Sequence, residues 1–312
     1  MLRQSVMRSW HLGASIEAWW LGLLLSAAAL AVLIWILAGS DWTETAAILG
    51  QTDVGWLAMA VLIALCVPVA KTVRWRLLLG AEAPLSWLFS LVVRARLLNA
   101  VVPLRAGDVW RVVETARTPR LGAVRALGSV AIDKMFDGAA IACLGALVVG
   151  WAGYAPALAV LAALVVWVVV VRGRVRLPGR RLTRWAEEWT VWSGRLHGWP
   201  ILVGALITTA LGMALGLLAN LAVLMALRFP VEVPTALAML VAGYAAGAVP
   251  AVPGRFGVFE AAVAAPLVAM GVAGSEAVAV AIVLHTVVLA DAALGALIGV
   301  ALPAVARRAP PL

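Results

Sequence analysis

The chain has 312 residues, of which 64% are hydrophobic and only 12% are charged, and its mean hydropathy is +1.04. Because a soluble domain carries roughly 25% charged residues, this composition excludes a soluble protein and predicts an all-α polytopic membrane protein. The excess of 24 Lys and Arg over 15 Asp and Glu is interpreted as a topology signal rather than a nucleic-acid surface. Cys66 and Cys143 both lie in apolar runs, which excludes a disulfide framework.

The hydrophobic segments predict the number of membrane spans. A helix needs about 20 mainly apolar residues to cross the hydrocarbon core. About six full spans are predicted, over residues 19–37, 54–79, 126–150, 155–171, 199–227 and 276–305. Two more apolar stretches, 84–103 and 234–270, are interrupted by proline and glycine. The first is predicted to be a re-entrant helical hairpin, because a full crossing would place outside the five arginines that follow it, Arg105, Arg111, Arg117, Arg120 and Arg125. The second is predicted to be a hairpin that enters from the opposite side. Breaks of this kind are tolerated at membrane depth only where protein or a wet cavity covers them.

Charged residues in the loops predict the orientation of these spans. The connection over residues 41–53 is acidic and has no basic residue, whereas Lys71, Arg74 and Arg76 lie near the end of the next span. The region 172–184 is rich in arginine, which is typical of a cytoplasmic loop. We therefore predict an integral protein of a prokaryotic cytoplasmic membrane, with its N- and C-termini in the cytoplasm.

The cytoplasmic linker over residues 172–199 contains a group of tryptophans. Trp185, Trp189 and Trp192 follow one another at spacings of four and three residues, which places them on one face of a helix. This pattern predicts a helix that lies in the membrane interface. Its role is interpreted as an anchor for the adjoining span, and lipid sensing is the alternative.

An internal repeat divides the chain at an offset of 150 residues. The pattern Glu-x-Pro at 82–84 recurs at 232–234, and Val-Pro-x-Arg-x-Gly at 102–107 recurs at 252–257. We predict a single transmembrane domain over 1–312, with repeat halves over about 54–150 and 204–300. The loop charges give the two halves opposite orientations, and inverted-topology repeats are typical of alternating-access transporters.

The two repeat motifs predict an anion site at the tips of the hairpins. In each motif a proline, Pro103 or Pro253, breaks the helix and an arginine, Arg105 or Arg255, follows. Free backbone N–H groups, the positive end of a helix and a guanidinium together favour a phosphate. Asp108 is predicted to be the N-cap of the first returning helix, and the second is predicted to begin near Phe256. The predicted substrate-binding set is Asn99, Arg105, Gly107, Asp108, Arg111, Gly254, Arg255, Gly257 and Glu260.

Both arginines have an alternative structural interpretation. An arginine inside a membrane costs about 2.5 kcal/mol or more on insertion scales, so it needs a partner or a function. Arg105 has Asp108 and Glu114 as local candidates for an ion pair, and Arg255 has Glu260.

Other charged residues of the spans extend the predicted site. Asp133 and Asp137 are four residues apart on one helix face, which suits a proton relay, and a Lys134–Asp137 pair is the alternative. His285 and Asp291 lie in the last span, where both are expected to approach the second tip, and Asp291 joins the candidate coupling residues. No metal and no cofactor are expected, since the sequence contains neither an HExxH nor a Walker motif.

Several of these motifs together resemble a known family. The segment RWRLLL at 74–79, the segment PLRAGD at 103–108 and the segment PGRFGVFE at 253–260 are similar to the flippase-like membrane domain of lysylphosphatidylglycerol synthases. The resemblance extends from about residue 19 to 305 and implies a lipid flippase module. The family usually has glycine where this chain has Arg255. We expect a stand-alone member of this family without the aminoacyl-transfer domain, so lysyl transfer is not expected of this chain.

The sequence therefore favours a transporter rather than an enzyme. The leading hypothesis is a flippase for a phosphate-bearing lipid, either an aminoacylated or other phospholipid or a polyprenyl-phosphate glycolipid. One alternative is an intramembrane lipid-phosphate transferase, which would need an acid, base or nucleophile beside the phosphate. The other is a non-catalytic membrane partner of a glycosyl- or aminoacyl-transferase. The expected partners are membrane lipids with phosphate headgroups, with a transferase as a further candidate and no nucleic acid; the oligomeric state is left open.

Overall fold

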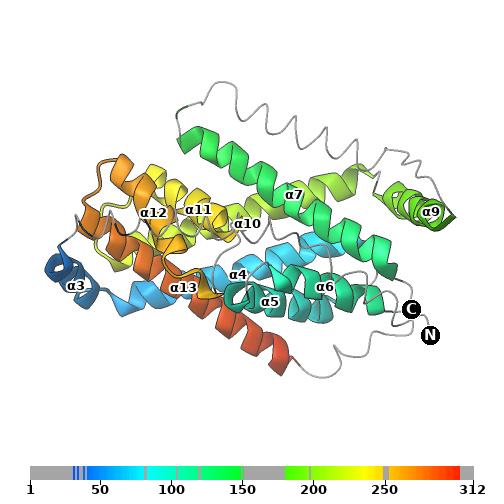
Figure 1. The fold of residues 1–312 in the computed structure, drawn as a ribbon, viewed down its shortest axis with the longest axis horizontal. Coiled ribbons are helices and arrows are strands. Elements are labelled where there is room, and N and C mark those ends of the chain that lie inside the picture. The colour runs from blue at the N-terminus through cyan, green and yellow to red at the C-terminus, as the bar shows by residue number, and fades with distance from the viewer. Residues whose placement is uncertain are drawn as a thin grey trace.

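The computed structural model describes residues 31, 34, 38, 41–80, 83–102, 105–118, 121–148, 150, 180–196, 198–248 and 253–302. Over these residues the secondary structure is helical and contains no β-strand, which confirms the all-α class (Figure 1). Most of the predicted span 19–37, the whole of 155–171, Pro103 and both chain termini lie outside the described residues.

Three of the described helices are long and apolar enough to cross a membrane: α4 (Val54–Leu79), α10 (Trp199–Ala226) and α13 (Gly274–Ala301). They correspond to the predicted spans 54–79, 199–227 and 276–305. The Asp53 side chain accepts hydrogen bonds from Gly55 N and Trp56 N at the start of α4, and Gly80 ends the helix in a left-handed conformation. The length and composition of these helices support an integral membrane protein.

Helix α7 (Gly122–Val148) corresponds to the predicted span 126–150. It has 27 residues, so it is about 40 Å long. Its middle carries Asp133, Lys134 and Asp137, and both carboxylates are buried. A buried charge needs a partner, and α7 packs against α4, α6, α10 and α11. These neighbours determine the chemistry of the site described below.

The linker helix α9 (Arg180–Arg195) packs on α7. The rings of Trp189 and Trp192 lie 5.1 Å apart, and Trp192 is buried, whereas Trp185 is 46% exposed. Both packed rings approach Gly128, where a Cβ atom would lie 2.3 Å from the Trp192 ring. The predicted tryptophan face therefore docks in part on α7, and only the Trp185 end of it is exposed.

Two pairs of shorter helices occupy the regions for which hairpins are predicted, and each pair is called a hairpin below. The first pair is α5 (Leu85–Val101) with α6 (Ala106–Arg117), and the second is α11 (Val233–Ala248) with α12 (Val258–Ala269), preceded by the 3₁₀ turn η1 (Pro253–Arg255). The helices of each pair pack on each other. The predicted extent of the first hairpin is wrong: residues 84–103 supply one unbroken helix, because no proline or glycine occurs between 85 and 101.

The same order of helix lengths occurs twice along the chain. Helices α4, α5, α6 and α7 have 26, 17, 12 and 27 residues, and α10, α11, α12 and α13 have 28, 16, 12 and 28. A further helix, α3 (Trp42–Gly50), precedes the first set. The Ser275 hydroxyl donates to Glu44 at 2.6 Å and ties α3 to the start of α13.

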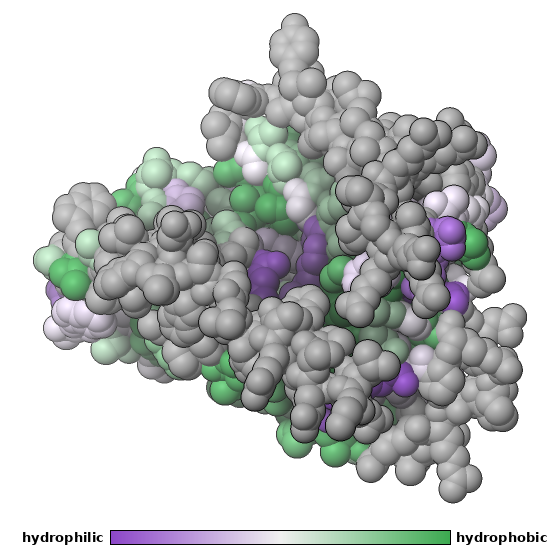
Figure 2. Space-filling view, turned by 45° about the vertical axis from the view of Figure 1, so that its right-hand side comes forward, coloured by the Kyte–Doolittle hydropathy of each residue, from purple (hydrophilic) through white to green (hydrophobic). Residues whose placement is uncertain are grey.

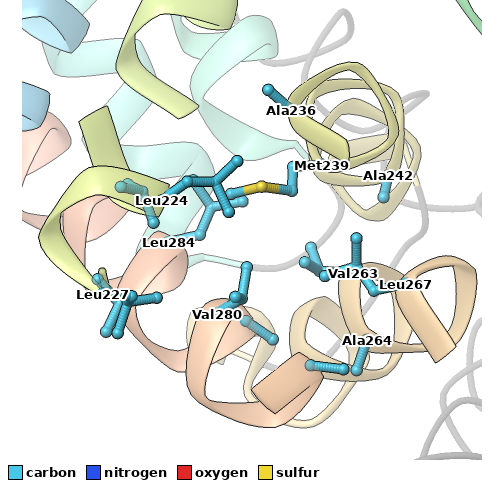
Figure 3. Close-up of a cluster of buried hydrophobic side chains, with 14 of the residues drawn as sticks. Leu224, Leu227, Ala236, Met239, Ala242, Val263, Ala264, Leu267, Val280 and Leu284 are labelled. Atoms are coloured by element: carbon cyan, nitrogen blue, oxygen red, sulfur yellow. The ribbon is translucent and has the colours of Figure 1, made fainter. Parts of the chain in front are cut away.

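Small side chains allow the helices of the second set to approach closely. The largest buried apolar cluster lies between α10, α11, α12 and α13, where Leu224, Met239 and Leu284 interdigitate with Val263 and Val280 (Figure 3). Alanines fill many of the remaining positions, as expected for helix contacts in lipid, where close packing replaces the hydrophobic effect. Large apolar side chains are exposed on the outside of the long helices, among them Leu62, Ile207 and Leu297.

Candidate functional site

A cavity of about 500 Å³ lies among the helices and is lined by residues of α4, α5, α6, α7, α10, α11, α12 and α13. Figure 2 shows hydrophilic residues deep in a hollow of the face that it presents, with hydrophobic residues above them. The cavity brings together most of the predicted site residues, namely Asn99, Arg105, Asp108, Arg111, Asp133, Lys134, Asp137, Arg255 and Asp291. Both repeat motifs therefore contribute to one cavity.

The predicted glycines shape the tips and do not line the cavity. A Cβ atom at Gly107 would lie 2.0 Å from the Ala95 carbonyl oxygen, so α5 and α6 cross in close contact there. Gly254 and Gly257 have φ angles of 74° and 81°, a region that side-chain-bearing residues rarely adopt. These three positions are explained by backbone geometry.

Glu260 also has a structural role at the second tip. Its carboxylate accepts a hydrogen bond from Gly257 N at 2.7 Å and caps α12, which begins close to the predicted Phe256. It also bonds His285 Nδ1 at 2.6 Å, and the His285 ring stacks on Phe259. The expectation that His285 approaches the second tip is therefore confirmed.

The first tip is capped by a side chain from the preceding helix. Asn99 Oδ1 accepts hydrogen bonds from the N–H groups of Gly107 and Asp108, at 2.9 and 3.3 Å. The prediction of Asp108 as N-cap is wrong: Arg105 is the N-cap residue, with φ 53°, and Asp108 lies in the first turn. Asn99 satisfies the free donors of α6 and leaves the Asp108 carboxylate available for another partner.

We expect Asn99→Ala to lower the free energy of unfolding by about 1 kcal/mol, the typical cost of losing a capping oxygen. Thermal unfolding of the purified protein in detergent measures this change. Asn99→Asp keeps the acceptor oxygen and is the matched control. Equal losses in the two variants would show that the capping bonds contribute little.

The two tip arginines bind across to the opposite repeat. Arg105 donates through Nε and Nη2 to the Gly247 carbonyl, at 3.0 and 2.7 Å, near the end of α11. Arg255 donates through Nη2 to the Asn99 carbonyl, at 3.0 Å, near the end of α5. The guanidinium of Arg255 also lies beside Gly247, because a Cβ atom there would be 3.5 Å from Nη1. The two guanidiniums therefore converge on one glycine.

The local ion pairs considered for these arginines are wrong. Glu114 pairs with Arg117 at 2.9 Å, and Glu260 is occupied by His285. Asp108 pairs with Lys134 at 3.1 Å. Within the described ranges, neither Arg105 nor Arg255 has a carboxylate within ion-pair distance. The hydrogen bonds that the described residues offer to these two arginines come from neutral carbonyl groups.

A buried ion network lies beside the tips. Asp133 accepts from Arg74 at 2.8 Å and from Arg111 at 3.1 Å, and Asp137 accepts from Arg74 and Lys71, both at 2.8 Å. The predicted alternative of a Lys134–Asp137 pair is wrong, because cations of α4 occupy Asp137. From the loop charges, Lys71 and Arg74 are predicted only to mark the cytoplasmic boundary of a span. The sequence signal for their pairing is the presence of two carboxylates, Asp133 and Asp137, one helical turn apart on another predicted span.

Asp291 connects the last helix to the first hairpin. Its carboxylate pairs with Arg96 of α5. Asp291 is expected from the sequence to approach the second tip, but its ion-pair partner lies on the first hairpin. Asp291 nevertheless lines the same cavity as Arg255. No group of three or more His, Cys, Asp or Glu side chains that could hold a metal ion is found among the residues that the structure describes.

The charges that line the cavity leave a positive excess. The six basic residues are Lys71, Arg96, Arg105, Arg111, Lys134 and Arg255, and the four acidic residues are Asp108, Asp133, Asp137 and Asp291. Every one of these carboxylates pairs with one of the basic side chains. Arg105 and Arg255 are the two basic lining residues that do not pair with any of these four carboxylates. Arg74, behind the wall, adds a further positive charge to the network.

Comparisons with known proteins identify the family. No curated protein matches the chain. The family model for the lysylphosphatidylglycerol synthase TM region matches residues 19–295, which contain both tips, the buried ion network and the whole lining of the cavity. Since the match extends over most of the 312 residues, the chain belongs to the lysylphosphatidylglycerol synthase TM region family.

Proposed function

We propose that the protein is a flippase that moves a phosphate-bearing lipid between the leaflets of the membrane, with the phosphate bound by Arg105 and Arg255. The observation that carries this proposal is the convergence of two guanidiniums without carboxylate partners, among the described residues, in one cavity. Guanidinium groups bind phosphate through strong charge-assisted hydrogen bonds. Membership of a flippase-like membrane family supports the same role.

The tip contacts suggest how binding is coupled to movement. A phosphate competes with the Gly247 and Asn99 carbonyls for the two guanidiniums, because a charged acceptor forms the stronger bond. Binding then releases the hydrogen bonds that hold each tip to the opposite repeat. The halves 54–150 and 204–300 are free to separate and expose the cavity to the other leaflet, as in alternating access.

We also propose the membrane layout predicted from the sequence, with the first hairpin formed by α5 and α6. The two halves have inverted topology, with about six full spans and the hairpins α5–α6 and α11–α12 entering from opposite sides. The linker over 172–199 and both termini lie on the cytoplasmic side of a prokaryotic cytoplasmic membrane. The recurrence of helix lengths in the two halves supports this arrangement.

The arrangement favours transport over catalysis. A transferase needs a carboxylate or another group that is free to exchange a proton at the phosphate. Asp133 and Asp137 each bond two basic side chains. Because these bonds hold both carboxylates as anions, we do not propose that Asp133 and Asp137 relay protons.

Exchange of fluorescent phospholipids in liposomes tests the function, with a membrane-impermeant quencher reporting the outer leaflet. We expect the wild-type protein to accelerate exchange over protein-free liposomes. Arg105→Ala and Arg255→Ala should each slow it about tenfold or more, since a hydrogen bond to a charged group contributes about 1.5–3 kcal/mol.

Arg228→Gln is the matched control for these variants. Arg228 is an exposed arginine that follows α10 and shares the left-handed backbone of the tip arginines, with φ 59°, but it does not line the cavity. Its replacement should leave exchange unchanged. Exchange that persists at the wild-type rate in both alanine variants would remove the arginines from the proposed phosphate site.

A further inference from the structure

We propose that the cavity selects lipids whose headgroup ends in a phosphate monoester and carries no amine. This inference rests on the proposed flippase function and specifies its substrate class. It is derived from the charges around the cavity and from the convergence of Arg105 and Arg255.

The tips of the two hairpins carry an uncompensated charge. Arg105 and Arg255 bring two positive charges to Gly247, and in the described part of the chain neither guanidinium forms an ion pair with a carboxylate, because the nearby Asp108 pairs with Lys134. Unpaired charges are costly within a membrane protein. A phosphodiester supplies one negative charge, whereas a monoester carries about −1.5 to −2 at pH 7 and has three strong acceptor oxygens. The charge of the monoester therefore balances that of two guanidiniums, and its three oxygens can accept hydrogen bonds from both of them.

The donor groups of the two arginines are directed to one region of the cavity. Arg255 uses only Nη2 to hold the Asn99 carbonyl, and the described structure gives no protein acceptor for its Nε and Nη1. Nη1 is the atom beside Gly247, where Arg105 also binds. Two guanidinium forks from different halves thus present donors to the same small region. A terminal phosphate, which has no second ester substituent, makes the fewest steric demands on this region.

None of the described carboxylates that line the cavity is free to pair with an ammonium group. A carboxylate is the side chain that would neutralise an amine headgroup, but the four that line the cavity each pair with a lining cation. Asp291 keeps one oxygen, Oδ1, without a hydrogen-bond partner. That atom is inaccessible, the residue is only 2% exposed, and its other oxygen bonds Arg96. An ammonium would therefore meet a cavity wall with an excess of positive charge.

A panel of three fluorescent lipids with identical acyl chains tests the inference in wild-type proteoliposomes. Phosphatidic acid is the monoester, phosphatidylglycerol is a diester without an amine, and phosphatidylethanolamine is a diester with an amine. We expect protein-dependent exchange of phosphatidic acid to be about tenfold faster than that of phosphatidylethanolamine, with phosphatidylglycerol between them; tenfold corresponds to about 1.4 kcal/mol.

A charge-removing variant separates selectivity from overall activity. Arg255→Gln leaves one unpaired guanidinium, so the preference for phosphatidic acid over phosphatidylglycerol should fall towards unity. Arg228→Gln, outside the cavity, should keep the wild-type preference. A preference that is unchanged in Arg255→Gln would contradict the charge-matching argument.

The outcomes for the wild-type protein distinguish the two proposals. Exchange of phosphatidylethanolamine or phosphatidylglycerol as fast as that of phosphatidic acid would overturn the headgroup inference and leave the flippase function standing. Exchange of none of the three lipids above the protein-free rate would overturn both.

Discussion

Replacing Arg74 with alanine is expected to lower the free energy of unfolding by about 3–5 kcal/mol, the cost of removing one partner from a buried ion pair. Arg74 is 1% exposed and holds Asp133 and Asp137 on α7 and Thr209 on α10. Without it, two neighbouring carboxylates remain buried, with Arg111 and Lys71 as their remaining ion-pair partners among the described residues. Thermal unfolding in detergent, followed by tryptophan fluorescence or by loss of the monodisperse peak, measures the effect.

An exposed ion pair provides the control for this prediction. Arg117 pairs with Glu114 at a similar distance, 2.9 Å, but its side chain is 72% exposed. Solvent-exposed pairs contribute about 0–1 kcal/mol, so Arg117→Ala should change the stability little. If the two variants lost the same amount, burial of the network would not be the source of its contribution.

The span boundaries were predictable because their signals are local. Asp53 and Gly80 bracket α4 as an N-cap and a left-handed C-cap, and the apolar run between them fixes the helix. Proline and glycine likewise placed the breaks near Arg105 and Arg255, which the structure brings to one cavity. Signals of this kind depend on neighbours a few residues away.

The partners of the charged residues were not predictable in this way. Arg74 bonds carboxylates 59 and 63 residues away, and Arg255 bonds a carbonyl 156 residues away. Pairing by sequence spacing proposed Lys134 with Asp137, but α4 and α6 place other charges beside both residues. The same limit explains Asp108, whose capping role is taken by Asn99 from the preceding helix. Tertiary packing decides such contacts.

The second large effect is expected at Gly107, where α6 crosses α5. A Cβ atom would lie 2.0 Å from the Ala95 carbonyl oxygen and 2.9 Å from Asn99 Oδ1. The first contact is with backbone, which cannot rotate away, so Gly107→Ala must displace the first turn of α6. Because overpacking typically costs 1–3 kcal/mol and occasionally more, we expect a loss of about 3 kcal/mol in the free energy of unfolding.

The displacement also affects the proposed phosphate site, because Arg105 lies two residues before Gly107 and its bonds to the Gly247 carbonyl depend on the position of this turn. Gly107→Ala should therefore slow lipid exchange as well as destabilise the protein. Gly212→Ala in α10 is the matched control: nothing lies within 4 Å of a Cβ there, so alanine should stabilise the helix by up to about 1 kcal/mol. Wild-type stability in Gly107→Ala would show that α5 and α6 are not in the close contact described here.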